Sequence, residues 1–152
     1  MTGTIDVREA GLADAAEVVR LLVQLGHDQP AGEPAARLAA FLDQGEQVLV
    51  AARAPSAPGS PLIGAVTLHI MPVMHRAGPT GRLTAVIVDE AERGKGIGRA
   101  LVGACEAFLL ARGCATIEIT SNKKRTDAHA FYEGLGYTAT SFRFAKQIGG
   151  TR

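Results

Sequence analysis

The chain has 152 residues, of which 47% are hydrophobic and 20% are charged, and its formal net charge is +1. This length and composition predict one globular domain, residues 1–152, and argue against a disordered chain. The charge gives no reason to expect a nucleic-acid partner. No apolar run approaches the roughly 20 residues that span a bilayer.

The N-terminus lacks the basic region and apolar run of a signal peptide, and two cysteines are too few for a disulfide framework. Cys105 and Cys114 fall in apolar patterns, so we interpret them as buried core residues and not as catalytic thiols. Together these features predict a cytoplasmic protein in a reducing compartment, with no membrane partner.

Strands and helices are interleaved in the first half of the chain. The spacing of apolar residues predicts a short strand around Ile5 and Val7, helices from Leu12 to Leu25 and from Pro34 to Leu42, and strands Gln47–Arg53 and Leu62–Ile70. The Pro- and Ser-rich stretch 54–61 predicts a flexible hairpin loop between these two strands.

The second half continues the alternation. Within Arg82–Asp89, apolar residues fall on both faces of a strand, which predicts a central, buried strand. The pattern then predicts a long helix that ends near Gly113, a strand over Thr116–Thr120, a helix over Asp127–Leu135 and a terminal strand over Thr138–Ile148. We therefore expect an α+β (mixed α/β) fold around one sheet.

A glycine-rich segment joins the predicted central strand to the long helix. It places three glycines among three cations, and its residues are Arg93, Gly94, Lys95, Gly96, Ile97, Gly98 and Arg99. The free N–H groups and the dipole of a helix start favour an anion, and glycine lets a phosphate approach the backbone closely. The segment therefore predicts a phosphate cradle, with a purely structural strand–helix turn as the alternative.

Two other phosphate motifs fit this segment poorly. A P-loop requires Lys-Ser or Lys-Thr, which is missing here, and a dinucleotide fingerprint is broken by Arg99 and follows a late strand. A nucleotide-dependent oxidoreductase is therefore disfavoured.

The pattern Arg93-x-x-Gly96-x-Gly98 after an apolar strand resembles the signature of the GCN5-related N-acetyltransferases. The segment DAHAFYEGLGY, residues 127–137, resembles a second feature of that family, and the order of elements also matches. From about Thr67 onward the chain is similar to the aminoalkylphosphonate N-acetyltransferases within it, at Thr120–Asn122, Lys124 and Arg125, Asp127–His129, Phe131 and Tyr132, and Phe142–Phe144.

This resemblance implies a single central, mostly antiparallel sheet flanked by helices, and acetyl-CoA as co-substrate. No residue is assigned as a metal ligand. It implies direct transfer of an acetyl group to the primary amine of a small molecule, such as an aminoalkylphosphonate or an amino acid. The glycine segment would bind the pyrophosphate, with backbone groups of Val86, Ile87 and Val88 along the pantetheine arm. Asn122 and Arg125 are further candidates for CoA contacts. A homodimer through the C-terminal strands is also implied.

The resemblance assigns Tyr132 as proton donor to the departing thiolate, with a core tyrosine as the alternative. The general base stays open, because Ala85 stands where many relatives carry a glutamate. Glu118, His69 and His75 are the candidates, since carboxylates and imidazoles accept protons near neutral pH. Direct capture of a neutral amine would need no base.

Three functional interpretations remain open from the sequence. A cluster of His69, His75, Arg76 and Arg143 would suit an anionic amine. A peptide or protein amine is a second possible acceptor. Loss of the strand glutamate is also compatible with a non-catalytic domain that senses acetyl-CoA, although a mere binder would not require Tyr132.

Overall fold

The computed structural model describes residues 3–26, 32–121 and 123–150. The chain divides into two compact units, Met1–Ile119 and Thr120–Arg152. The assignment of residues 1–152 to one domain stays a prediction. The expected α+β class is confirmed.

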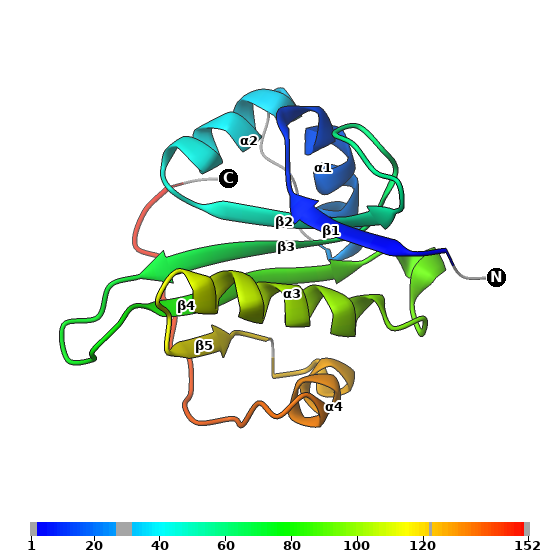
Figure 1. Ribbon diagram of the computed structural model, residues 1–152. Coiled ribbons are helices and arrows are strands. Elements are labelled where there is room, and N and C mark those ends of the chain that lie inside the picture. The colour runs from blue at the N-terminus through cyan, green and yellow to red at the C-terminus, as the bar shows by residue number, and fades with distance from the viewer. Residues whose placement is uncertain (1–2, 27–31, 122, 151–152) are drawn as a thin grey trace. The chain divides into compact units, whose positions relative to one another are not determined.

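The first unit is a five-stranded sheet with three helices (Figure 1). Its strands lie in the order β1-β2-β3-β4-β5, antiparallel except for the parallel pair β4–β5. The predicted strands and helices of this unit are all confirmed, with small shifts at their ends. The elements are β1 Ile5–Glu9, α1 Ala15–Gln24, α2 Pro34–Asp43, β2 Gln47–Arg53, β3 Leu62–Met71, β4 Thr80–Val88, α3 Ile97–Ala111 and β5 Thr116–Ile119, with short 3-10 turns η1 Leu12–Asp14 and η2 Glu90–Glu92.

Helices cover both faces of the sheet. Apolar residues of α1 and α2 form one core cluster with alternate residues of β2, and with Ala65 of β3 and Ile87 of β4. Gly64 precedes Ala65 and therefore points to the opposite face. There a Cβ at Gly64 would come within 2.6 Å of Leu101 on α3. The sheet is thus sandwiched between α1 with α2 on one face and α3 on the other (Figure 1).

Strand β4 has two neighbours over its first part only. It pairs with β5 from Thr80 to Leu83, and from there to Val88 it pairs with β3 alone among the described strands. The β3–β4 register skips Thr84, which is a β-bulge that bends the strand. The prediction of a central strand therefore holds only for the first part, because β5 has four residues. The prediction of burial fails at Thr84, which is exposed, and holds at Ile87, which is 1% exposed.

An ion pair fastens the N-terminal strand to the loop between β2 and β3. Arg8 donates hydrogen bonds of 2.7 and 3.0 Å to the Asp14 carboxylate, whose side chain is fully buried. Gly11 N–H and Gly59 N–H donate to the same carboxylate at 2.8 and 2.9 Å. Arg8 also donates to the side chain of Ser56. The loop that its composition predicts to be flexible is therefore anchored at several points.

The second unit contains one helix, α4, Thr126–Gly134. No strand occurs in residues 138–150, so the predicted terminal strand Thr138–Ile148 is wrong. Phe142, Phe144 and Ile148 are 88%, 92% and 93% exposed. The physical reason is that a strand requires a hydrogen-bonded neighbour, and none of the described residues of this unit provides one.

Asp14→Asn tests the N-terminal network. Burial by itself raises the pKa of the Asp14 carboxyl, but the Arg8 guanidinium and the N–H groups of Gly59 and Gly11 outweigh it, so this pKa lies below its ordinary value. The stability it contributes is therefore present above the unfolded pKa of about 4 and is lost as pH falls through the folded value. In thermal denaturation we expect the variant to lose about 2 kcal/mol at neutral pH.

The same variant should also show a flatter loss of stability in acid than the native chain. Asp43→Asn, at an exposed carboxylate, is the matched control and should keep the native acid slope. Identical acid slopes in the native chain and Asp14→Asn would contradict the proposed linkage.

Candidate functional site

The glycine segment forms an open loop at the start of α3. Gly94 and Gly96 have φ of +80° and +82°, a conformation that side chains with a Cβ rarely adopt. Gly96 is the N-cap of α3 and makes no side-chain capping hydrogen bond. The first amides of the helix have no partner within it. A Cβ at Gly94 or Gly96 would meet nothing within 4 Å, so the space beside these amides is open to an anion.

Cations surround this loop, and one carboxylate links two of them. Glu92 accepts from Lys95 at 3.1 Å and from Arg53, at the end of β2, at 2.6 Å. The Lys95 ammonium, followed by Arg53, holds the pKa of Glu92 below its usual range. Arg93 donates to the carbonyl of Val88 at 3.3 Å. The sequence could have indicated the Glu92–Lys95 ion pair, because the two residues are three positions apart. The Arg53–Glu92 ion pair was not predicted, because Arg53 is 39 positions away in the chain.

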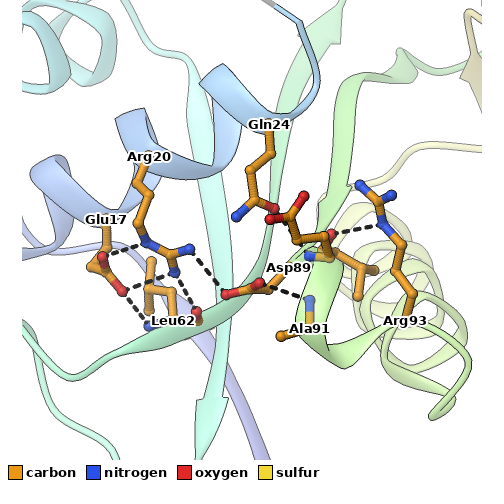
Figure 2. Close-up of polar contacts among 9 residues, drawn as sticks. Glu17, Arg20, Gln24, Leu62, Asp89, Ala91 and Arg93 are labelled. Carbon is orange, nitrogen blue, oxygen red and sulfur yellow. Dashed lines mark hydrogen bonds and ion pairs between the residues drawn. The ribbon is translucent and has the colours of Figure 1, made fainter.

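A second network ties α1 to the end of β4 (Figure 2). Arg20 donates two hydrogen bonds to Glu17, of 2.7 and 3.1 Å, one to Asp89 at 3.0 Å and one to the carbonyl of Leu62 at 2.9 Å. Asp89 also accepts from Ala91 N–H at 3.1 Å and so caps the turn η2. This N–H, and then Arg20, lower the pKa of Asp89. The network fixes where the glycine loop leaves the sheet.

The backbone before the glycine segment is the second part of β4, which does not pair with β5. Ile87 is buried in the core, and Val86 and Val88 are half-buried. Their main-chain groups on the side away from β3 have no pairing strand in the first unit. The predicted binding residues Val86, Ile87 and Val88 therefore lie on an unpaired strand edge, and the chain leads from it through η2 to the glycine loop.

Four polar side chains form a row across the face of the sheet that carries α1 and α2. His69 lies opposite Arg82, and Arg82 lies opposite Glu118. Glu46 precedes β2, whose register puts it across from His69. Ala65 and His69 share a face by strand alternation, and Ala65 belongs to the α1–α2 core. We call Glu46, His69, Arg82 and Glu118 the polar row.

Two close contacts join the members of the polar row in pairs. His69 Nδ1 lies 2.6 Å from Glu46 Oε1. Arg82 donates to Glu118 Oε2 at 2.9 and 3.3 Å. Arg76 lies 3.9 Å from the other oxygen of Glu118, so two guanidinium groups share one carboxylate.

The structure separates the three candidate bases. His69 and Glu118 lie in the polar row, whereas His75 lies exposed in the connection between β3 and β4. Ala85 follows the bulge, where the Thr84 hydroxyl donates to the carbonyl of Thr67 at 3.1 Å. Sequence reasoning missed Glu46, because only the strand register brings it beside His69.

The other predicted residues belong to the second unit. Tyr132 lies on α4 with its ring against Phe131 and edge-on to Tyr137, at centroid distances of 5.4 and 6.3 Å. Burial raises the pKa of the Tyr132 phenol, and Arg125 partly opposes this shift, so the phenol is protonated at neutral pH. Arg125 is exposed at the start of α4. Asn122 lies outside the described residues.

The cysteines are buried and free, as predicted. Burial, and to a smaller extent Glu106, raise the pKa of the Cys105 thiol to about 12, so it is not a nucleophile at neutral pH. Among residues 3–26, 32–121 and 123–150, no helix has both the length and the apolar character needed to cross a membrane.

The sequence profile of the Acetyltransferase (GNAT) family matches residues 17–137. The chain therefore belongs to the GNAT family of acetyltransferases, whose acetyl donor is acetyl-CoA. The predicted family and its fold are confirmed.

Several characterised relatives match part of the chain. It is 33% identical over 87 residues to an aminoalkylphosphonate N-acetyltransferase of Salmonella typhimurium, covering 57% of this chain and 56% of that protein. It is 32% identical over 83 residues to a glucosamine 6-phosphate N-acetyltransferase of Trypanosoma brucei brucei, covering 54% of each. The matched region thus spans about half the length of these relatives.

Solved structures match over nearly the whole chain. An acetyltransferase of Trypanosoma brucei superposes with a TM-score of 0.80 at 25% identity, covering 95% of this chain and 100% of that one. Glucosamine-6-phosphate N-acetyltransferase of Arabidopsis thaliana superposes with a TM-score of 0.80 at 20% identity, covering 96% and 99%. The second likeness concerns the fold alone.

Proposed function

We propose that this protein transfers the acetyl group of acetyl-CoA directly to the primary amine of a small molecule. The observation that carries the proposal is the open, uncapped start of α3 directly after a strand edge without a second neighbour. Amides of Ile97, Gly98 and Arg99 would bind the pyrophosphate, and the charges of Arg93 and Lys95 favour it. The backbone from Val86 to Val88 would bind the pantetheine arm.

The reaction forms one bond and breaks one. The amine nitrogen gives its electron pair to the acetyl carbonyl carbon, and the carbon–sulfur bond breaks, with its electrons leaving on sulfur. The amine loses a proton to a base, and the thiolate takes one from the Tyr132 phenol in this proposal. The phenol is protonated at neutral pH, so it holds the proton that this step requires.

The acceptor in this proposal is an amine that also carries an anionic group, such as an aminoalkylphosphonate or an amino acid. Arg82 and Arg76 share the single carboxylate of Glu118, which leaves a net positive charge at that end of the polar row. A phosphonate, phosphate or carboxylate would pair with this charge. Two relatives are named for acceptors with phosphonate or phosphate groups.

Two further parts of the proposal concern the setting of the enzyme. Free, buried Cys105 and Cys114 suit a reducing, cytoplasmic compartment. The exposed apolar side chains of Phe142, Phe144 and Ile148 offer a surface for a second copy of the chain. A peptide amine as acceptor, or a domain that only senses acetyl-CoA, are the competing functions.

Thiol release from acetyl-CoA should be measured over a panel of amines. We expect turnover with 2-aminoethylphosphonate or an amino acid to exceed turnover with the neutral amine of equal length, because only the anionic acceptors pair with Arg82 and Arg76. Acetyl-CoA binding by calorimetry without turnover of any amine would indicate the sensor. Turnover confined to peptide amines would indicate a protein substrate.

Gly96→Val tests the cradle. A β-branched side chain disfavours φ of +82° and places a Cβ in the space beside the amides, so the Kd for acetyl-CoA should rise more than about tenfold. Gly103→Val, on an open face of α3 without a positive φ, is the matched control. Unchanged affinity in a Gly96→Val chain that folds by circular dichroism would contradict the cradle.

Tyr132→Phe tests the proton donor. The variant removes one hydroxyl and keeps the ring contacts, so kcat should fall about 100-fold while the Kd for acetyl-CoA stays near native. Tyr137→Phe, the other tyrosine of the chain, should retain the native kcat. Equal kcat in Tyr132→Phe and the native chain would remove this role from the phenol.

A further inference from the structure

The pair Glu46–His69 has the geometry of a carboxylate–imidazole dyad. The contact joins His69 Nδ1 to Glu46 Oε1 at 2.6 Å, with the His69 side chain 40% exposed and Glu46 20% exposed. An ionised carboxylate accepts from the N–H at Nδ1, which leaves the lone pair of the imidazole on Nε2. The exposed imidazole can therefore take a proton from a molecule in solution, while the carboxylate stabilises the imidazolium that results.

We propose that His69 is the general base for the acceptor amine and that Glu46 is its positioning residue. This inference rests on the proposed acetyl transfer and supplies the base that Ala85 does not. In the reaction, one proton passes from the amine nitrogen to His69 Nε2 as the carbon–nitrogen bond forms. The imidazolium then returns this proton to water before the next turnover.

The place of His69 in the sheet fits this role. Thr67, two residues earlier on the same face of β3, pairs with Ala85 of β4, next to the bulge at Thr84. Beyond this bulge β4 parts from β5, and the strand edge proposed for the pantetheine arm begins. On this face of β3, His69 is therefore two residues from Thr67, which lies opposite the start of that strand edge.

The charges around His69 support a free Nε2. The dyad has Glu46 on its β2 side and Arg82 on its β4 side, and Arg82 is occupied by Glu118. Glu118 therefore holds the guanidinium that would otherwise compete for Glu46, and the charge of Arg76 remains in excess at that end of the row. Asp43, at the end of α2, is the other acidic residue close to Glu46 in the chain, and its side chain is exposed to solvent. Glu118 itself serves two arginines, which makes it the weaker candidate for a base.

The polar row then divides between two tasks. Its Glu46–His69 end receives the amine, and its Arg82 end, with Arg76, receives the anionic group of the acceptor. A zwitterionic acceptor would lie along the row with its charges matched to it.

The test compares variants of the full chain in kcat, Kd for acetyl-CoA and the pH profile of kcat/KM. His69→Ala should lower kcat about 100-fold or more, with the Kd for acetyl-CoA unchanged. Added imidazole should restore part of the rate, because an exposed site admits a small base. Glu46→Gln should lower kcat less than His69→Ala does, with the Kd for acetyl-CoA unchanged, because the imidazole loses the carboxylate that orients it. Glu46→Asp, which keeps a carboxylate, should retain more of the native rate than Glu46→Gln.

Glu9→Gln, at an exposed glutamate at the end of β1, is the matched control and should keep the native rate and profile. The dyad is overturned if His69→Ala binds acetyl-CoA normally and keeps the native kcat and pH profile, which would favour direct capture of a neutral amine. A rate loss in His69→Ala that imidazole does not restore, with the native kcat kept in Glu46→Gln, also overturns it. Failure of the proposed function is distinct, because the native chain itself would then release no thiol with any amine.

Discussion

The binding edge proposed for acetyl-CoA depends on the end of β4–β5 pairing after Leu83. A sheet strand normally satisfies its backbone on both sides, and β4 does so only where the four residues of β5 reach it. The bulge at Thr84 bends the strand at the same point. The chain then runs from a strand edge that β5 does not pair with, through η2, to the start of α3. Backbone donors and acceptors are thus gathered along one path without the need for particular side chains.

The sequence predicts well what depends on near neighbours in the chain. A short continuous apolar run predicts β2 with its observed bounds, because both faces of this strand are buried. The 3.6-residue period predicts α1 and α3, because each helix buries one face. The glycine loop is equally local, since Gly94 and Gly96 are needed for a left-handed backbone. The wrong prediction at Thr138–Ile148 shows the limit, because an alternating pattern describes a side-chain arrangement and cannot supply the pairing strand.

The features that the sequence does not predict all join distant residues. Arg20 reaches Asp89 across 69 positions, and Arg53 reaches Glu92 across 39. Glu46 is the clearest case, because its meeting with His69 depends on the register of β2 against β3. A one-residue slip would turn His69 to the other face of the sheet. Chemistry-bearing residue types can therefore be named from sequence, but their partners follow only from the fold.

The two halves of the proposed site differ in how the sequence constrains them. The glycine loop acts through its backbone, so its substitution alters φ or closes the open space beside the amides. The polar row acts through half-buried side chains on the α1–α2 face, outside the apolar core cluster. Changes in the row therefore cost little packing, because the removed atoms leave no internal cavity. In the proposed function, such a division would let one fold keep a single acetyl donor while the acceptor changes. The choice of acceptor would then depend on Arg82, His69 and their carboxylate partners.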